Sequence, residues 1–349
     1  MDAVRVVGLL LCACTSTGPS PDRTPHIPDA GALLVATTDY EVGTVALVDP
    51  ATGRLTDNLA ITGGDPQVRV VGGMVAVLDR YSGDGLRLYD PADWTAPLHS
   101  IPVEGPANLH DVAAWSDRIV ATQYEHAELL VAGLSDGLLR PGIALDAFAD
   151  ADGLPEASSI WATEDGLIVA LQRLQRDNGW APASGRLVAV DLESGTARAL
   201  ADVGPNPRLH HGVLATGVFF EADGALARVA SDGTVEPPMV TEAELGVDLG
   251  PLAEVAGVVV FTGIDLASGD LARVWCLEWA TGALTEGPQW PGMWVSSATD
   301  GPLDGAWLAL RSGWSGGAGM PGLVRIDPET CAETDRIETV LEPYDVVRL

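Results

Sequence analysis

The sequence contains no lysine, so all 19 of its basic residues are arginines, and they are outnumbered by 49 aspartates and glutamates. The formal net charge of -30 repels the phosphate backbones of nucleic acids, which excludes nucleic-acid binding as a working hypothesis. The hydrophobic fraction is 47%, which is ample for a sizeable core. A globally disordered chain is therefore excluded as well.

Long hydrophobic runs are also missing. The apolar run near the N-terminus, Val6 to Ala13, is much shorter than the roughly 20 residues that a membrane-spanning helix needs. It suits the hydrophobic region of a secretory signal peptide, which we place at residues 1–13. The run ends in Leu11-Cys12-Ala13-Cys14, which resembles a bacterial lipobox. The resemblance implies that Cys14 becomes the lipidated first residue of the mature protein.

Residues 14–30 are expected to be the lipid anchor and a flexible tether rich in Ser, Thr and Pro. The lipobox resemblance implies that N-terminal acyl chains hold the protein in a lipid bilayer of a bacterial cell envelope. Thr15 stands where an aspartate would retain a lipoprotein in the inner membrane, so the outer membrane is expected. A soluble secreted protein and a wrongly assigned start codon remain as alternatives.

Cysteine is scarce, with only 4 in the chain. Cleavage before a lipidated Cys14 removes Cys12 and leaves Cys276 and Cys331. Because the expected compartment is oxidising, these two residues can form a disulfide. Cys276 is predicted to lie inside a strand and Cys331 at a turn in the following repeat, and the sequence leaves their pairing open.

The rest of the chain, residues 31–349, repeats one pattern: an apolar strand, a turn, a second strand and an acidic turn. The acidic turns include Asp49-Pro50 and Asp327-Pro328, where the aspartate is expected to accept hydrogen bonds from backbone amides two residues further on. Seven apolar strands can be aligned, and they begin at residues 33, 74, 118, 167, 217, 258 and 306. Their spacing of roughly 40 to 50 residues is the length of one β-propeller blade.

The last segment of the chain completes this pattern. Six of the aligned strands are preceded by another strand, but the first is not, because the segment before residue 33 lacks a strand pattern. Residues 343–349 supply the missing strand, since they match residues 109–115 in the order of apolar and polar positions. The sequence therefore predicts an all-β fold, a seven-bladed β-propeller whose ring is closed by the C-terminal strand. Closure leaves no exposed sheet edge.

The Asp-Pro-X-Thr-Gly turn at residues 49–53 and the blade period resemble the YVTN-like and quinoprotein-like seven-bladed propellers. The resemblance covers residues 31–349 and implies an architecture, not a function. Quinone-dependent dehydrogenases of this architecture carry a tryptophan four residues after the turn glycine. Neither Gly53 nor Gly195 is followed by one, and no cofactor is expected.

Polar residues at the starts of the inner strands are predicted to line the central channel. They are Gln67, His110, Asp111, Ser158, His210, His211 and Asp345. A ring of histidines and aspartates could hold a metal, as in lactonase-type propellers. The intervening blades offer Gln, Ser and Met293 instead, so a hydrogen-bonded channel lining is the preferred interpretation, and no metal site is assigned. The chain contains neither a G-X-S-X-G nor an H-E-X-X-H motif.

An acidic segment at residues 146–156 loosely resembles a calcium-binding loop. It carries Asp146, Asp150, Asp152 and Glu156 around Gly153. The regular spacing of oxygen ligands is incomplete, so a solvated acidic loop is the preferred interpretation and calcium binding remains the alternative.

Tyrosines gather in one sector of the predicted ring. Those at 40, 81 and 124 follow the second strands of the first three blades, and the one at 344 begins the inner strand of the first blade. These positions share one face of a propeller, and tyrosine and tryptophan are favoured at binding surfaces. The sequence predicts a binding surface for a protein or glycan partner made of Tyr40, Arg80, Tyr81, Tyr124, Glu125, His126, Trp180 and Tyr344. The alternative is that tyrosine merely suits strand ends.

The sequence thus predicts a surface-anchored, non-catalytic binding or scaffold lipoprotein of the bacterial envelope. The alternative is a metal-dependent, lactonase-like hydrolase with its site at the mouth of the propeller channel.

Overall fold

The computed structural model describes residues 27–28, 31–80, 85–210, 217–313 and 319–349. The expected signal peptide, the lipidation site Cys14 and nearly all of the tether lie outside the described residues. Tyr81 of the expected binding surface and His211 of the expected channel lining lie outside them as well.

The described residues form seven four-stranded sheets arranged around a central axis, and a short two-stranded hairpin. The predicted seven-bladed β-propeller is confirmed.

From the channel outward, the first four blades consist of the following strands. Blade 1 has β30 (Pro343–Arg348), β1 (Leu33–Thr38), β2 (Gly43–Asp49) and β3 (Arg54–Thr62); blade 2 has β4 (Pro66–Val71), β5 (Met74–Asp79), β6 (Gly85–Tyr89) and β7 (His99–Pro102). Blade 3 has β8 (Leu109–Trp115), β9 (Arg118–Gln123), β10 (Glu128–Gly133) and β11 (Ile143–Ala144); blade 4 has β12 (Ala157–Thr163), β13 (Gly166–Leu171), β16 (Arg186–Asp191) and β17 (Thr196–Asp202).

The remaining blades follow the same order. Blade 5 has β18 (Arg208–Leu209), β19 (Gly217–Ala222), β20 (Ala225–Ala230) and β21 (Val240–Thr241). Blade 6 has β22 (Val247–Val255), β23 (Val258–Asp265), β24 (Leu271–Glu278) and β25 (Ala283–Pro291); blade 7 has β26 (Met293–Gly301), β27 (Gly305–Ser312), β28 (Gly322–Asp327) and β29 (Ala332–Ile337). The described helical segments are short: the 3-10 turns η1 (Asp146–Phe148) and η2 (Arg176–Asn178), and α1 (Glu242–Leu245).

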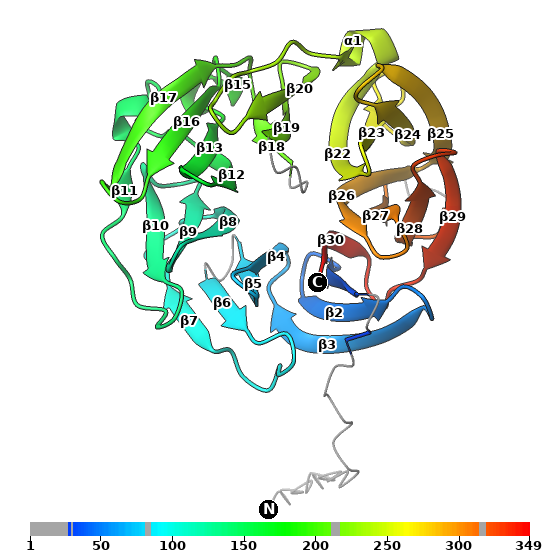
Figure 1. Cartoon of the computed structure of the whole chain (residues 1–349), viewed down its shortest axis with the longest axis horizontal. Coiled ribbons are helices and arrows are strands. Elements are labelled where there is room, and N and C mark those ends of the chain that lie inside the picture. Colours follow the sequence, from blue (N-terminus) through cyan, green and yellow to red (C-terminus); the bar gives the residue numbers. More distant parts are fainter. Residues whose placement is uncertain (1–26, 29–30, 81–84, 211–216, 314–318) are drawn as a thin grey trace, which may run out of the picture.

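The ring closes as the sequence predicts. The C-terminal strand β30 pairs antiparallel with β1, and Val346 lies opposite Val35. The first blade therefore combines the two ends of the propeller, and its innermost strand is the last in the chain (Figure 1). Closure pairs the inner edge of β1, which would otherwise expose unpaired backbone groups.

The core lies between the blades. Each of seven clusters of buried apolar side chains draws its members from two neighbouring blades. Between blades 7 and 1, for example, Val35, Trp307 and Val346 are almost completely buried. The middle strands β1 and β2 are buried except for the half-buried Asp49 at the end of β2, whereas the outer strand β29 is mostly exposed. This gradient explains why the apolar strands of the sequence repeat once per blade.

Acidic turns join the outer strands of several blades. Asp49, Asp191 and Asp327 each accept a hydrogen bond through Oδ1 from the backbone amide two residues further on, at 2.8–3.0 Å. Gly53 and Gly195 follow with φ angles of 68°, which a glycine adopts without strain. The turn chemistry expected from the Asp-containing repeats is thus present.

A disulfide joins Cys276 to Cys331, which settles the pairing that the sequence leaves open. Cys276 lies on β24 of blade 6, and Cys331 lies in the turn between β28 and β29 of blade 7. Both are buried in the cluster between these blades, and 55 residues separate them in sequence. The bond therefore ties two adjacent blades together.

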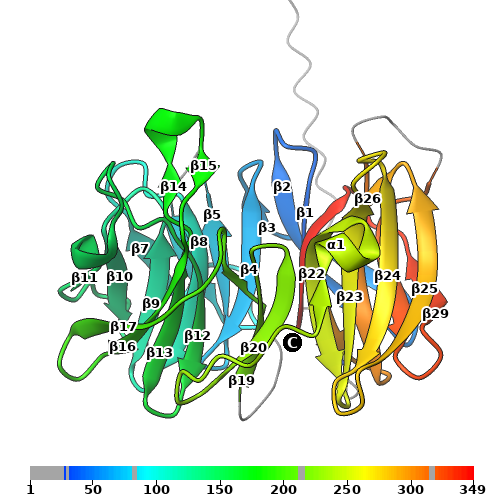
Figure 2. The same ribbon diagram turned by 90° about the horizontal axis from the view of Figure 1, so that it is seen from above.

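The two faces of the ring differ in the strand ends and loops that they carry. We call the face that carries the starts of the inner strands and the loops after the second strands the upper face. The hairpin of β14 (Leu174–Gln175) and β15 (Ala181–Pro182) belongs to the long loop after β13 and projects above the neighbouring blades (Figure 2). No helix among the described residues is long and apolar enough to cross a membrane.

Candidate functional site

A cavity of about 430 Å³ lies in the central channel. Six of the residues expected to line the channel do line it: Gln67, His110, Asp111, Ser158, His210 and Asp345. Other polar residues of the lining were not predicted from the sequence, among them Arg69, Ser159, Gln172, Asn206, Arg208 and Ser297. Most of the inner strands contribute to it, so the cavity is a property of the closed ring.

Arg69 organises one side of the cavity. Its Nε donates to Asp111 Oδ1 at 2.8 Å, and its Nη1 donates to Asp345 Oδ2 at 2.6 Å. Burial works against the charge of Arg69, but the two carboxylates outweigh it and raise the pKa of the guanidinium. Arg69 therefore stays charged and links blades 1, 2 and 3.

The same inner-strand position links neighbouring blades elsewhere in the ring. Asp345 Oδ2 accepts from the amide of Val68, and Asp111 Oδ2 accepts from the amide of Ile160, both at 3.0 Å. Ser159 Oγ accepts from the amide of Leu209 at 2.8 Å. Each of these side chains accepts a hydrogen bond from a backbone amide of the next blade.

These hydrogen bonds decide whether the channel residues could coordinate a metal ion, as the ring of a lactonase-type propeller would. Both oxygens of Asp111 and Oδ2 of Asp345 already accept hydrogen bonds, and Asp345 Oδ1 accepts from the Ser297 hydroxyl at 2.6 Å. With a guanidinium between them, the two carboxylates do not suit a cation. The residues present in the channel therefore do not fit a metal ring.

The imidazole of His110 also lines the cavity. Its ring stacks on the ring of Tyr124, with centroids 4.2 Å apart and planes at 14°. Burial, and then the charges of Arg80 and Arg208, hold the pKa of His110 well below its usual range, although Asp111 opposes them. The imidazole is therefore neutral at pH 7 and can accept a proton.

Two arginines at the same end of the cavity are less fully engaged than Arg69. Arg80 donates through Nη2 to Asp65 Oδ1 at 2.6 Å and to the Tyr344 hydroxyl at 3.0 Å, while its buried Nε has no acceptor among the described residues. Arg208 is exposed, and its side chain makes no ion pair with any other described residue. The lining of the cavity thus carries three arginines, Arg69, Arg80 and Arg208, beside the two aspartates Asp111 and Asp345.

The expected tyrosine surface is formed only in part. Tyr40 and Trp180 are exposed to 53% and 51%, and Tyr344 meets the Tyr40 ring edge-on at 6.1 Å. Tyr124 is buried, which corrects its assignment to an exposed surface. The reason is that its ring stacks on His110 and its hydroxyl donates to Gln172 Oε1 at 2.6 Å. Its phenol pKa is raised, chiefly by burial.

Glu125 and His126, also expected on the binding surface, are not freely exposed side chains. Glu125 forms an ion pair with Arg176 of η2, and His126 is half-buried. Arg176 lies 4.8 Å from the Trp180 ring and so connects this tryptophan to the wall of the ring. Ligand binding by these residues stays a prediction.

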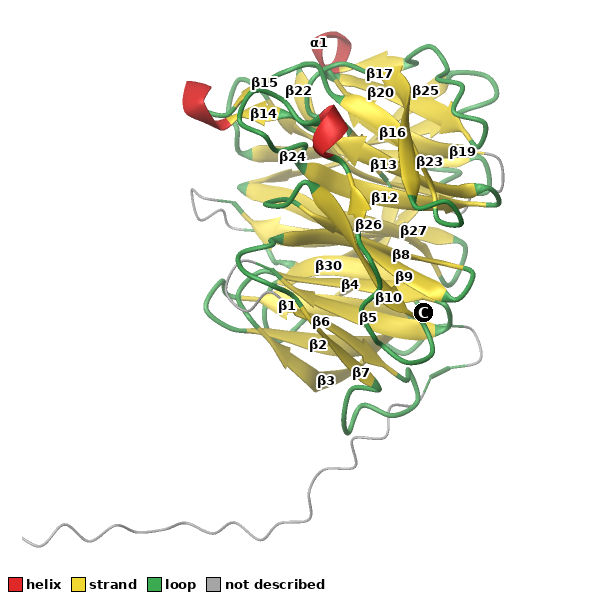
Figure 3. Cartoon of the chain, turned by 90° about the vertical axis from the view of Figure 1, so that its left-hand side faces the viewer, coloured by secondary structure: helices red, strands yellow, loops and turns green. Residues whose placement is uncertain are grey.

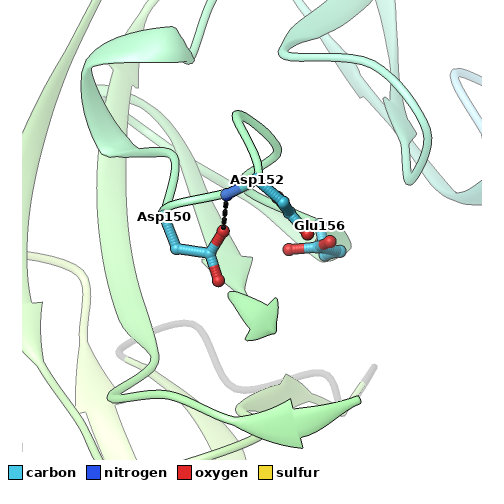
Figure 4. A group of neighbouring side chains, drawn as sticks. All are labelled: Asp150, Asp152 and Glu156. Atoms are coloured by element: carbon cyan, nitrogen blue, oxygen red, sulfur yellow. Dashed lines mark hydrogen bonds between the residues drawn. The ribbon is translucent and has the colours of Figure 1, made fainter. Parts of the chain in front are cut away.

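The acidic segment at residues 146–156 is only in part the solvated loop expected from the sequence, because Asp146 is exposed but Glu156 is buried. Asp150, Asp152 and Glu156 converge, with one oxygen from each within 4.8 Å of the others (Figure 4). Glu156 is completely buried, and its Oε1 accepts from Arg176 Nε at 3.0 Å. Burial raises the pKa of Glu156 to about 7. Arg176 also lies 3.9 Å from Asp152, so an arginine neutralises this cluster.

Solved structures of the same fold cover most of the chain. A Bacteroides uniformis protein provisionally named as a 6-phosphogluconolactonase has a TM-score of 0.63 at 14% identity, covering 91% of this chain and 99% of its own. A Bacteroides fragilis protein with the same provisional name has a TM-score of 0.62 at 12% identity, covering 93% and 99%. The dihydro-haem d1 dehydrogenase NirN has a TM-score of 0.54 at 14% identity, covering 92% and 77%. No family model and no curated protein sequence matches the chain.

At these identities the likenesses show a shared β-propeller fold. They also correct the prediction of a protein without enzymatic activity, because a dehydrogenase and two provisionally named lactonases have this fold over nearly the whole chain. The prediction relied on the absence of familiar catalytic motifs. Propeller active sites are assembled from separate blades, so the absence of a contiguous motif does not exclude one.

Proposed function

We propose that the protein is a hydrolase that opens small anionic lactones in the cavity of its central channel. The observation that carries the proposal is the neutral imidazole of His110, which lines a polar cavity together with Arg80 and Arg208. An enzyme that hydrolyses an ester needs a base that is unprotonated at neutral pH and donors for developing negative charge. The cavity offers both.

The reaction uses these groups in sequence. The imidazole of His110 takes a proton from a water molecule, whose oxygen attacks the carbonyl carbon of the lactone. Arg208 stabilises the negative charge that develops on the carbonyl oxygen. The bond between that carbon and the ring oxygen then breaks, and the imidazolium returns its proton to the departing alkoxide. One water is consumed, and a hydroxy acid is released.

The names of two structural neighbours support this substrate class. The substrate of a 6-phosphogluconolactonase is a lactone with a phosphate group, and both provisionally named proteins share the fold of this chain. Arginine is well suited to bind phosphate because its planar guanidinium offers several donors. The Nε of Arg80, which has no acceptor among the residues that the structure describes, provides one such donor at the cavity.

The test is hydrolysis of 6-phosphoglucono-δ-lactone and of unphosphorylated glucono-δ-lactone. The rate of acid release is measured and compared with the rate of spontaneous hydrolysis. We expect turnover of both, with the higher kcat/KM for the phosphorylated substrate. His110→Phe keeps a ring for Tyr124 to stack on but removes the base, and kcat should fall about 100-fold or more. The matched control His99→Phe, on the outer strand β7, should be unaffected. Turnover at the spontaneous rate by the wild type would refute the proposal.

The proposal places this enzyme in the bacterial envelope as a lipoprotein anchored through Cys14. The lipobox-like residues Leu11-Cys12-Ala13-Cys14 and the Ser/Thr/Pro-rich tether support it. Metabolic labelling with palmitate should mark the wild type but not Cys14→Ser. Equal labelling of both proteins would exclude Cys14 as the anchor.

A further inference from the structure

A second, smaller pocket of about 160 Å³ adjoins the channel cavity between blades 6 and 7, and we call it the side pocket. Its walls come mainly from β22 and β23 of blade 6 and from β26 of blade 7. Four residues line both the side pocket and the channel cavity: Arg208, Pro251, Trp294 and Ser296. The side pocket is therefore a branch of the cavity in which we place the proposed reaction.

Irregular pairing of two neighbouring inner strands accompanies this space. The register of β22 against β23 shifts between Leu249 and Leu252. The register of β26 against β27 shifts between Val295 and Ser297. A bulge bends its strand and increases the local twist. The side pocket lies beside both bulges, where the two strands leave room between the blades.

The walls of the side pocket are mainly apolar. Aliphatic and aromatic side chains come from Leu249, Pro251, Ile264, Trp294 and Val295. The two hydroxyl groups of the lining are engaged with the backbone, because Thr262 Oγ1 donates to the carbonyl of Pro251 at 2.9 Å and Ser296 Oγ donates to the carbonyl of Ala309 at 3.3 Å. Walls of this kind favour an apolar ligand group, whose burial removes apolar surface from water.

Arg208 connects the side pocket to the proposed chemistry. It lines both spaces, and it is the group to which we assign the carbonyl oxygen of the lactone. A lactone bound in this way has its ring at the junction of the two spaces. Asp248, the other charged residue of the side pocket, is exposed. Arg80 follows β5 of blade 2, across the channel from blade 6, so the anionic and apolar groups of one ligand would reach different walls (Figure 1).

We infer that the side pocket binds a short alkyl substituent of the lactone, and that Ile264, Trp294 and Val295 determine the preferred chain length. The substrates are then lactones with a short aliphatic side chain, and this inference rests on the proposed function for the reacting ring. The volume of about 160 Å³ holds roughly five carbon atoms, since a water molecule, which is similar in size to a methylene group, takes up about 30 Å³.

The experiment compares kcat/KM of the full chain for three lactones with the same ring. They are δ-valerolactone without a side chain, δ-octalactone with a propyl group and δ-dodecalactone with a heptyl group. Each buried methylene group contributes a factor of about four, so kcat/KM for δ-octalactone should exceed that for δ-valerolactone by about 10- to 50-fold. The heptyl chain is longer than the side pocket, so δ-dodecalactone should gain little more.

Two substitutions of Ile264, which is half-buried on β23, change the size of the side pocket. Ile264→Phe fills it, and the ratio of kcat/KM for δ-octalactone to that for δ-valerolactone should fall about 10-fold. Ile264→Ala enlarges it, and the preference should move towards δ-dodecalactone. The matched control is Ile61→Phe on the outer strand β3, where the side chain is exposed, and it should keep the wild-type ratio. Melting curves identify a variant that fails to fold, and the other substitution of Ile264 then decides.

A calorimetric titration separates this inference from the proposed reaction. It uses the hydroxy acids that hydrolysis of δ-valerolactone and δ-octalactone yields, and the longer acid should bind at least about 10-fold more tightly. If no lactone is hydrolysed but this preference is present and is lost in Ile264→Phe, the proposed function fails and the side pocket stands. Lactone hydrolysis with equal kcat/KM for δ-valerolactone and δ-octalactone would overturn the inference alone. A preference that grows by the same factor per carbon up to δ-dodecalactone, or that Ile264→Phe and Ile61→Phe change equally, would also overturn it.

Discussion

Asp345 Oδ2 accepts hydrogen bonds from Arg69 Nη1 at 2.6 Å and from the amide of Val68 at 3.0 Å, across 276 and 277 residues of sequence. The last strand of the chain is thereby bonded to the inner strand of blade 2. This carboxylate contributes to ring closure and to the wall of the cavity at once. Arg69 carries the link onward to Asp111 of blade 3.

Asp345→Asn should destabilise the ring. The amide removes one of two charges that balance the buried guanidinium of Arg69, and breaking a buried pair costs about 3 kcal/mol or more. Urea unfolding at pH 7 measures the loss. The control Asp202→Asn removes an exposed partner of Arg186, a pair of the kind that contributes about 1 kcal/mol or less. Equal effects of the two substitutions would contradict the importance of the Asp345 link.

Reduction of the disulfide should lower stability without changing the fold. The bond between Cys276 and Cys331 ties blades 6 and 7, and a bond that closes a loop of this size contributes about 2–4 kcal/mol. Urea unfolding with and without a reductant measures the difference. The double variant Cys276→Ser and Cys331→Ser is the control, because a reductant should not change its stability. If a reductant leaves the free energy of unfolding of the wild type unchanged, the disulfide either does not form or does not stabilise the fold.

The acid limb of the hydrolysis rate should lie below the ordinary titration range of histidine, about pH 6.5. The pKa of His110 is lowered, so the neutral base persists as pH falls to values at which an exposed histidine is protonated. The pH profile of kcat/KM measures this limb. In Arg208→Gln one of the lowering charges is gone, and the limb should move to higher pH. If the acid limb of the pH profile is the same in Arg208→Gln as in the wild type, His110 is not the base of the reaction.

Glu156 should make stability depend on pH between about 4.5 and 7. Its pKa is about 7 in the folded chain, against an ordinary value of 4.5, so the folded state binds the proton more tightly. Stability contributed by this group is therefore fully present at low pH and is lost as pH rises through about 7. Urea unfolding of the wild type and Glu156→Gln across pH 4.5–8 measures the difference between them. A difference that stays constant over this range would show that Glu156 titrates normally.

The sequence by itself determined the architecture of the ring. Each blade carries its own apolar strands and its own turn residues, such as Asp49, Gly53 and Asp327, so the pattern is local and repeats at a readable period. Closure by residues 343–349 could be inferred because only the first repeat lacked an inner strand. The residues at the starts of the inner strands could be placed at the channel for the same reason.

Only the tertiary structure decided what those residues do. Arg69 and Arg208 occupy ordinary strand positions. Nothing nearby in sequence shows that carboxylates of two other blades hold Arg69, while Arg208 makes no ion pair with any described residue. Tyr124 and Glu156 were expected at the surface, yet the first stacks on His110 and the second is buried under Arg176 of a distant loop. Charge, burial and pKa depend on neighbours brought together by ring closure, and a local pattern carries no information about those neighbours.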